Sequence, residues 1–206
     1  MNETTDTTAE ELLDFWFADA ATDPDAVRRR NRVWFKRDPA FDRQCIERFA
    51  QTLQAAANGS LDHWNDTPRG RLAFIILLDQ LSRNIHRGDA AAFRQDARAL
   101  AACLEGIALG DDRALSPIER SFFYLPMEHA EDRSIQEKSV KHFEALAEEA
   151  PEGLREQLEA NAGYARQHRD IVDRFGRFPH RNEVLGRASS TEEESYLADG
   201  APRFGQ

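Results

Sequence analysis

The segment Asp38–Gly59, DPAFDRQCIERFAQTLQAAANG, indicates the fold class. It opens with an aspartate that can cap a helix and a proline suited to the first helical position. Phe41, Cys45, Phe49 and Leu53 then recur every four residues, which is the spacing of one helix face. An asparagine–glycine pair ends the segment, as is typical of a helix C-terminus. The segment therefore predicts an amphipathic helix with its own start and stop signals.

Start signals of the same kind recur along the chain. Thr8, Ser116 and Thr191 each precede a glutamate by three residues, as in capping boxes. Asp23 and Thr67 each precede a proline, which favours a helix start. Between these signals the apolar residues recur at spacings of three or four, and no convincing alternating strand pattern is present. The chain is therefore predicted to be all-α.

We expect a single domain, residues 1–206, of about eight or nine helices whose short connections favour antiparallel pairs. The length suffices to bury a core, and 41% hydrophobic with 31% charged residues is typical of soluble globular proteins. Residues 1–7 are expected to be flexible, and residues 200–206 to form a C-terminal tail. Pro126 is expected to cut short the helix that follows Ser116, because proline lacks a backbone N–H.

The charge balance argues against general nucleic-acid binding. The chain has 27 basic and 37 acidic residues, a net charge of −10, and an acidic chain repels phosphate backbones. The longest purely apolar run, Leu72–Leu78, is too short to cross a membrane. Cys45 and Cys103 fit neither a zinc motif nor a disulfide framework. With no signal-peptide pattern in the first residues, the expected location is the cytoplasm. No pattern indicates an oligomeric state.

The first polar motif is Asp79–Arg87, DQLSRNIHR, at the end of a strongly apolar helix. Asp79, Arg83 and Arg87 are spaced by four and share one stripe, with Asn84 beside it. One interpretation is a row of ligand-binding groups. The alternative is structural: Asp79 pairs with Arg83 along the helix, and Arg87 stabilises the helix C-terminus.

The second polar motif is Tyr124–Asp132, YLPMEHAED, which combines Glu128, His129 and Asp132. A histidine oriented by a carboxylate can act as a base or bind a metal. The alternative is that the acidic residues simply complement the N-terminus of the next helix.

Two further motifs lie near the C-terminus. His168 precedes Ile171 and Val172 by three and four residues, so it is expected to point inward with that apolar face, either as a core histidine or as a ligand-binding group. Arg174–Arg187, RFGRFPHRNEVLGR, is a basic, aromatic segment in an acidic chain. A rigid turn lined with guanidinium groups suits a carboxylate or phosphate. The alternative is a structural clamp in which its arginines pair with preceding carboxylates: Asp79, Glu128, Glu131 and Asp132.

Several common site types find no support. No glycine-rich phosphate loop, zincin motif or serine elbow is present. The histidines lack a short diagnostic metal-binding spacing. We therefore expect no metal and no cofactor.

Three segments carry a family resemblance: Leu77–Gly88 (LLDQLSRNIHRG), Phe122–Asp132 (FFYLPMEHAED) and Arg174–Arg187. In these the chain resembles the bacterial family called domain of unknown function 924, over almost its whole length. The resemblance implies an all-α, tetratricopeptide-like superhelix and transfers no activity. Ser82 stands where the family pattern usually has proline. Ala130 stands where serine is usual, which argues against a serine nucleophile there.

The leading hypothesis is a pocket that binds a small anionic molecule or peptide, with acid/base chemistry left open. The expected catalytic residues are Glu128, His129 and His180. The expected ligand-binding residues are Asp79, Arg83, Asn84, Arg87, Asp132, His168, Arg169, Arg177, Arg181 and Asn182. The alternative is a tetratricopeptide-like interaction scaffold in which the polar motifs are structural clamps.

Overall fold

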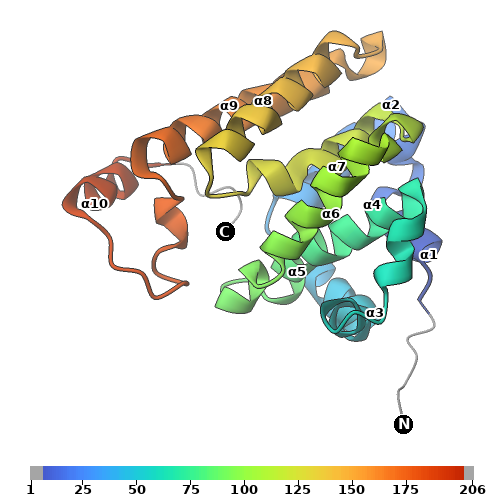
Figure 1. The fold of residues 1–206 in the computed structure, drawn as a ribbon, viewed down its shortest axis with the longest axis horizontal. Helices are drawn as coiled ribbons and strands as arrows, with labels where there is room; N and C mark the ends of the chain where they lie inside the picture. Colours follow the sequence, from blue (N-terminus) through green and yellow to red (C-terminus); the bar gives the residue numbers. More distant parts are fainter. Residues whose placement is uncertain (1–6, 202–206) are drawn as a thin grey trace.

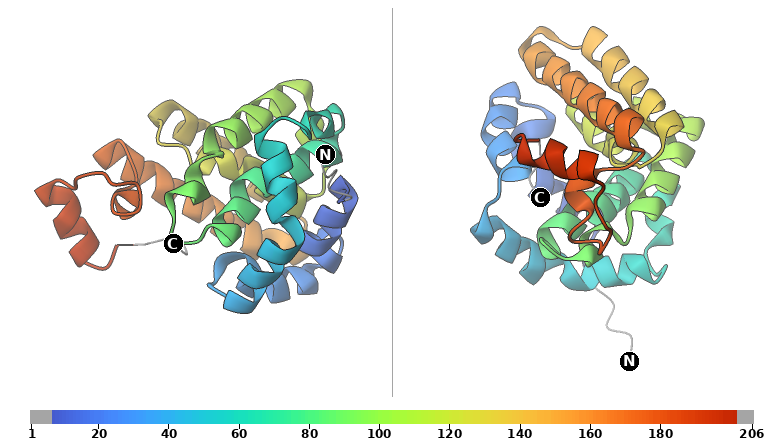
Figure 2. Two further views of the ribbon diagram at one scale, coloured as in Figure 1. Left: turned by 90° about the horizontal axis from the view of Figure 1, so that it is seen from below. Right: turned by 90° about the vertical axis from the view of Figure 1, so that its left-hand side faces the viewer.

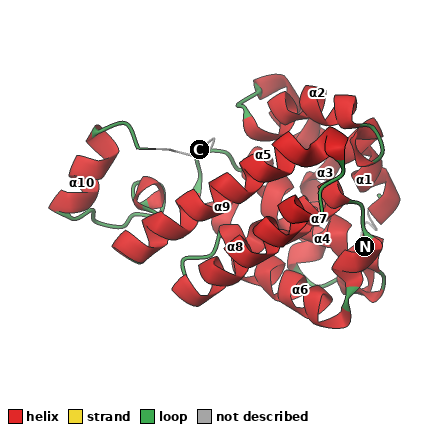
Figure 3. Ribbon diagram, turned by 90° about the horizontal axis from the view of Figure 1, so that it is seen from above, coloured by secondary structure: helices red, strands yellow, loops and turns green. Residues whose placement is uncertain are grey.

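Regular structure in the computed structural model, which describes residues 7–201, is helical throughout (Figure 1). Figure 3 shows helices and loops but no strand in this range, which confirms the all-α prediction. Residues 1–6 and 202–206, which hold most of the expected flexible N-terminus and tail, lie outside the described residues. The α-helices are α1 (Ala9–Phe17), α2 (Pro24–Phe35), α3 (Pro39–Ala57), α4 (Pro68–Ile76), α5 (Ser82–Ile85), α6 (Asp96–Leu109), α7 (Pro117–Glu128), α8 (Arg133–Glu148), α9 (Arg155–Phe175) and α10 (Thr191–Ala198).

A turn of π-helix, η3 (Leu77–Leu81), joins α4 directly to α5. The backbone N–H of Ser82 donates to the carbonyl of Leu77, five residues back. A π turn inside a longer helix is rare and is frequent at functional sites. This one carries Asp79 and therefore sets the direction in which the first polar motif faces.

Most helix boundaries follow the predicted capping chemistry. The Asp38 carboxylate accepts from the backbone N–H groups of Ala40 at 2.9 Å and Phe41 at 3.2 Å, and starts α3. At the other end of the chain, Gly176 ends α9 with a left-handed φ of 71°. Residues that carry a Cβ atom rarely adopt that conformation. The polar segment that follows is therefore turned away from the axis of α9.

Two expected boundaries are wrong. Pro126 lies inside α7 instead of ending it early, because the helix is buried on both sides of the proline and packing outweighs one lost hydrogen bond. The last capping box begins at Ser190, not Thr191. Glu193 accepts from the Ser190 N–H at 2.7 Å while the Ser190 hydroxyl accepts from the Glu193 N–H at 3.2 Å.

The helices form a body with an appended hairpin. Residues 70–82, in α4, the π turn and the first position of α5, are all buried at its centre. The chain reverses between α8 and α9, so these two long helices form an antiparallel pair beside the body of α1–α7 (Figure 1). The other views agree that α10 lies beyond the end of α9 (Figure 2). Antiparallel pairing fits the resemblance, and a regular tetratricopeptide-like superhelix stays a prediction.

An aromatic cluster joins the first helices to α7. The Phe122 ring lies 4.7 Å from Trp34 and 5.6 Å from Trp16 between ring centroids. The Trp34 indole N–H donates to the Trp16 carbonyl at 2.9 Å. Together these contacts fix α2 against α7, and the candidate site opens next to them.

Candidate functional site

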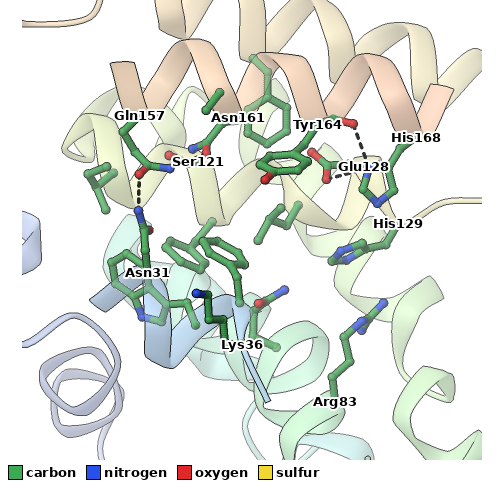
Figure 4. Close-up of a pocket in the computed structure, with 18 of the residues that line it drawn as sticks. Asn31, Lys36, Arg83, Ser121, Glu128, His129, Gln157, Asn161, Tyr164 and His168 are labelled. Carbon is green, nitrogen blue, oxygen red and sulfur yellow. Dashed lines mark hydrogen bonds and ion pairs between the residues drawn. The ribbon is translucent and has the colours of Figure 1, made fainter. Parts of the chain in front are cut away.

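A cavity of about 480 Å³ lies between α2, α7, α9 and the end of the π turn (Figure 4). The short 3₁₀ turn η7 (Pro179–Arg181) contributes His180 and Arg181 to its wall. Small-molecule sites in proteins are commonly of this size.

The cavity is polar at both ends and mostly apolar between them, where Figure 4 also shows Lys36. The titratable end holds Arg83, Glu128, His129, His168, His180 and Arg181. The apolar middle holds Val27, Trp34, Phe35, Ile118, Phe122, Leu125, Phe143 and Tyr164. The far end holds the uncharged amides Asn31, Gln157 and Asn161. Figure 4 shows Asn31 bonded to Gln157 on one side of the rings and Glu128 beside His168 on the other.

Behind the titratable end lies a buried carboxylate, Asp79. Its Oδ1 is 2.8 Å from His129 Nδ1 and 3.1 Å from Arg83 Nη1. Its Oδ2 accepts from Gln80 Nε2 at 2.6 Å. Burial alone would raise the pKa of Asp79, but the Arg83 charge and the contact with His129 hold that pKa below its ordinary value. Asp79 is therefore ionised at neutral pH.

The contact with Asp79 fixes the tautomer of His129. An ionised carboxylate can only accept a hydrogen bond, so Nδ1 carries the proton and Nε2 presents a lone pair. Burial lowers the pKa of His129 below its ordinary value, despite the opposing charge of Asp79. The ring is therefore neutral at pH 7, and Figure 4 shows it directed from the end of α7 towards the cavity. This is the arrangement of a histidine base oriented by a carboxylate.

Glu128, next to His129 on α7, is an acid held protonated. Burial, and then the negative charge of Asp79, raise the pKa of Glu128 to about 8. Its Oε1 lies 3.1 Å from His168 Nδ1. The same nitrogen lies 2.9 Å from the carbonyl oxygen of Tyr164, and a carbonyl only accepts, so Nδ1 of His168 carries a hydrogen. Burial lowers the pKa of His168 well below its ordinary value, so Glu128 and His168 form a contact between neutral groups.

Arg181 is a buried cation with unused hydrogen-bonding capacity. Its guanidinium lies between two rings, 4.9 Å from the Phe93 centroid and 4.5 Å from the Phe178 centroid. Nη1 donates to the His129 carbonyl at 3.1 Å and lies 3.6 Å from an Asp96 oxygen. Nε is buried and has no hydrogen-bond partner among the described residues. Burial lowers the pKa of Arg181 to about 10, so the side chain remains charged.

His180 precedes Arg181 and also borders the cavity. Burial and the neighbouring Arg181 charge lower the pKa of His180 to about 3. A histidine with this pKa is a neutral hydrogen-bonding group at pH 7 and a weak base. Its expected role as an acid/base group therefore has less support than that of His129.

Arg83, in the first polar motif, already uses most of its hydrogen-bond donors. Its two terminal nitrogens each donate a hydrogen bond to Asp96 at 3.0 Å, in addition to its pairing with Asp79. Asn84 and Arg87 both donate to the Asp42 carboxylate, at 2.8 Å from Asn84 Nδ2 and 2.8 Å from Arg87 Nε. Arg83 and Arg87 border the cavity, whereas Asn84 does not.

The remaining predicted residues lie outside the cavity. Arg177 donates to both oxygens of Glu193 at 2.7 Å, and Asn182 accepts from Arg187 at 3.0 Å. Asp132 caps α8 by accepting from the Ile135 N–H at 3.0 Å. Arg169 pairs with its exposed neighbour Asp170 at 2.7 Å. Their predicted ligand-binding roles stay predictions, and these contacts give them a structural role.

The cavity also contains residues that the motifs did not predict. Its aromatic middle and amide end come from α2 and α9, where the sequence shows ordinary helix residues. One signal was present: Gln157, Asn161, Tyr164 and His168 recur at three or four residues along α9, which places them on one face. This face combines amide, aromatic and histidine side chains, whereas the inward face of an ordinary amphipathic helix is apolar.

Residues 7–201 offer neither a metal-binding cluster nor a membrane-spanning helix. No group of three or more His, Cys, Asp or Glu side chains lies close enough to hold a metal ion. No helix in this range combines the length and apolar character needed to cross a membrane.

Comparison with known proteins places the chain in a family. The model of a family described as bacterial protein of unknown function (DUF924) matches residues 12–201, so the chain belongs to that family. A solved structure, that of the protein of unknown function ATU0120 from Agrobacterium tumefaciens, is similar with a TM-score of 0.79 and 38% identity. The match covers 93% of this chain and 97% of that one. No curated protein matches the chain.

Proposed function

We propose that this member of the DUF924 family binds a small monoanionic molecule in its cavity, and that His129 and Glu128 act on it as an acid–base pair. One observation carries the proposal: a neutral histidine, oriented by buried Asp79, and a protonated carboxylic acid are adjacent in sequence and border the same cavity. Titratable pairs whose surroundings push their pKa values apart are typical of acid–base catalysis.

Charge balance supports a ligand with one negative charge. Four cations border the cavity: Lys36, Arg83, Arg87 and Arg181. Three carboxylates contact the arginines: Asp42, Asp79 and Asp96. Because Glu128 is protonated and the histidines are neutral, one positive charge remains. A monoanion would neutralise the site, whereas a dianion such as phosphate would leave it with a net negative charge.

Arg181 is the group best suited to hold the anion. It is buried beside the acid–base pair, and its Nε lacks a partner among the described residues. A charged donor of this kind is costly to bury unless something accepts its hydrogen bond. A ligand carboxylate at the cavity end would place a neutralising charge beside this guanidinium, which borders the cavity.

The scaffold alternative rests on the clamps of the last segment, such as Arg177 on Glu193. Those contacts hold that segment in place under either hypothesis. The size of the cavity and the neutral acid–base pair favour a small molecule over a peptide surface.

The test is a thermal-shift series with small monocarboxylates (acetate, propionate and benzoate), their neutral amides, and succinate as a dianion. We expect the monocarboxylates to raise the unfolding midpoint by mass action, more than the other two groups do. Arg181→Gln should remove this response, measured from the variant's own midpoint. Arg174→Gln, an exposed arginine of the same segment, should retain it. Equal responses to acids and amides, or a full response in Arg181→Gln, would contradict the proposal.

The role of Glu128 has a separate signature. Above pH 8 its ionisation adds a negative charge to the site, so monocarboxylate affinity should fall as the pH rises through 8. Glu128→Gln should bind equally at pH 7 and pH 9. A decline that persists in Glu128→Gln would show that another group titrates.

A further inference from the structure

We infer that the ligand is an amphipathic monocarboxylate, with its carboxylate at the Arg181 end and an unbranched apolar chain along the aromatic middle of the cavity. This inference rests on the proposed function and adds the chemical class of the ligand. It draws on three features that the acid–base pair does not use: the ring-lined middle, its exposed rim and the amide end.

The middle of the cavity offers carbon surfaces to a ligand. Trp34, Phe122 and Phe143 are buried and border it. Phe35 stacks nearly parallel to Phe122, with 6.0 Å between ring centroids and 4° between ring planes. All four rings border the cavity. A fully polar ligand would leave this wall in contact with water.

The rim of the cavity exposes aromatic surface. Phe35 is 49% exposed and Tyr164 is 51% exposed, and both border the cavity from opposite helices, α2 and α9. Isolated exposed apolar residues are common, but exposed rings that flank a hollow are typical of ligand-binding grooves. An apolar chain lying between them would cover both.

The dimensions fit a chain and exceed a small acid. Gln157 and His168 lie eleven residues apart on α9, which corresponds to about 16 Å along the helix axis. A carboxylate of two or three carbons would fill one end of this length. The apolar section stops at the amides, where Gln157 Nε2 donates to Asn161 Oδ1 at 2.8 Å. A chain that reaches them gains no further apolar contact.

The experiment is a calorimetric titration with acetate, butyrate, hexanoate, octanoate and decanoate at one pH. Burying one methylene contributes roughly a fourfold gain in affinity. We expect that gain at each added methylene, followed by a plateau once the chain reaches the amides. Octanamide, which has the chain without the charge, should bind at least tenfold more weakly than octanoate.

A matched pair of variants locates the chain. Ala160 borders the cavity on α9, in line with Gln157 and Tyr164, and Ala160→Phe would narrow the apolar section. The ratio of octanoate to butyrate affinity should fall towards one in Ala160→Phe. Glu159→Phe adds the same ring at the adjacent exposed position, which does not border this cavity, and should keep the wild-type ratio.

The outcomes separate the two proposals. If acetate and octanoate bind equally and both need Arg181, the chain inference fails while the proposed monoanion site stands. If the octanoate-to-butyrate ratio survives in Ala160→Phe, the chain lies elsewhere and the inference also fails. If no acid of the series binds, both proposals fail.

Discussion

The arginine-rich last segment and the end of α7 are both dense polar clusters, but they differ in how completely their groups are paired. In the last segment Arg177 is matched by both oxygens of Glu193, and Arg187 donates to both oxygens of Glu131 at 2.5 and 2.9 Å. At the end of α7, Glu128 is held protonated, and Arg181, which the last segment contributes to this end of the cavity, has an Nε with no partner among the described residues. The more conspicuous cluster in the sequence is the more fully matched one.

The difference is consistent with the site proposed above at the end of α7. Matched charges at a partly exposed site stabilise the fold modestly and leave little capacity for a ligand. Incompletely matched groups in a buried site cost stability, and strongly shifted pKa values cluster at functional sites. The following substitutions should therefore have larger effects at the end of α7 than in the last segment.

The largest effect is expected from Asp79→Asn. The change removes the charge that compensates Arg83 and orients His129, and breaking a buried ion pair costs about 3 kcal/mol. Chemical denaturation should show this loss in the free energy of unfolding. Asp170→Asn, which breaks the exposed contact with Arg169, is the control and should stay within about 0.5 kcal/mol. A loss of stability below about 1 kcal/mol for Asp79→Asn would mean that Asp79 is not needed to compensate the buried charge of Arg83.

A gain of stability is expected from Glu128→Gln. The folded-state pKa of Glu128 is about 8, against a reference value of 4.5, so between these values the folded state holds a proton that the unfolded state has released. Wild-type stability therefore falls as the pH rises from 4.5 to 8. Glutamine does not titrate, and the variant should be more stable by about 3 kcal/mol at pH 7.

Denaturation curves at pH 4 and pH 7 would check this sign. The advantage of Glu128→Gln should vanish at pH 4, where wild-type Glu128 is protonated in both states. A variant that is less stable than wild type at pH 7 would contradict the raised pKa.

A smaller loss is expected from Arg187→Gln in the last segment. Arg187 and Glu131 are about one quarter exposed, and pairs of this kind contribute about 1 kcal/mol. A double-mutant cycle with Glu131→Gln would isolate the pair from the other contacts of Arg187. Monocarboxylate binding should be unchanged, because neither residue borders the cavity. Weakened binding would mean that the two clusters are coupled.

The smallest effect is expected from Arg174→Ala. This side chain is 52% exposed and pairs with the exposed Glu192 at 2.8 Å. Its loss should change the free energy of unfolding by no more than about 0.5 kcal/mol. The thermal unfolding midpoints of the two variants can be compared directly. A larger shift for Arg174→Ala than for Arg187→Gln would reverse the ranking within the last segment.

Local signals in the sequence predicted the helices well. Asp38, Gly176 and the capping glutamates act within one turn of chain, so their chemistry is readable from neighbouring residues. Pro126 was misjudged because its helix is stabilised by packing from other parts of the chain. Helix starts and ends are thus set by neighbouring residues, whereas tolerance of a proline inside a helix depends on tertiary packing.

The candidate site was predicted in part. His129, Glu128, Arg83, His168 and Arg181 do border one cavity, since short motifs with mixed charge mark helix ends that meet. The pairing of the arginines was not readable. Of the four carboxylates proposed as clamp partners for the last segment, Glu131 does hold one of its arginines, whereas the partner of Arg177 comes from α10.

The apolar part of the cavity could not be predicted from the sequence. Trp34 and Phe122 have the spacing and composition of core residues and are buried, while Phe35 reads as an ordinary exposed helix residue. Which ring faces a cavity depends on the volume left between α2, α7 and α9, and no local pattern records that volume.

The π turn at Leu77–Leu81 has a consequence for chain length. A turn closed by a five-residue step holds one residue more than an α-helical turn. Deleting a single residue there, such as Gln80, would let an ordinary helix form and would rotate Asp79 by about 100° relative to Arg83. The site is therefore sensitive to insertions and deletions in this turn even where every site residue is kept, and a relative with a gap at this position should lack the Asp79–His129 contact.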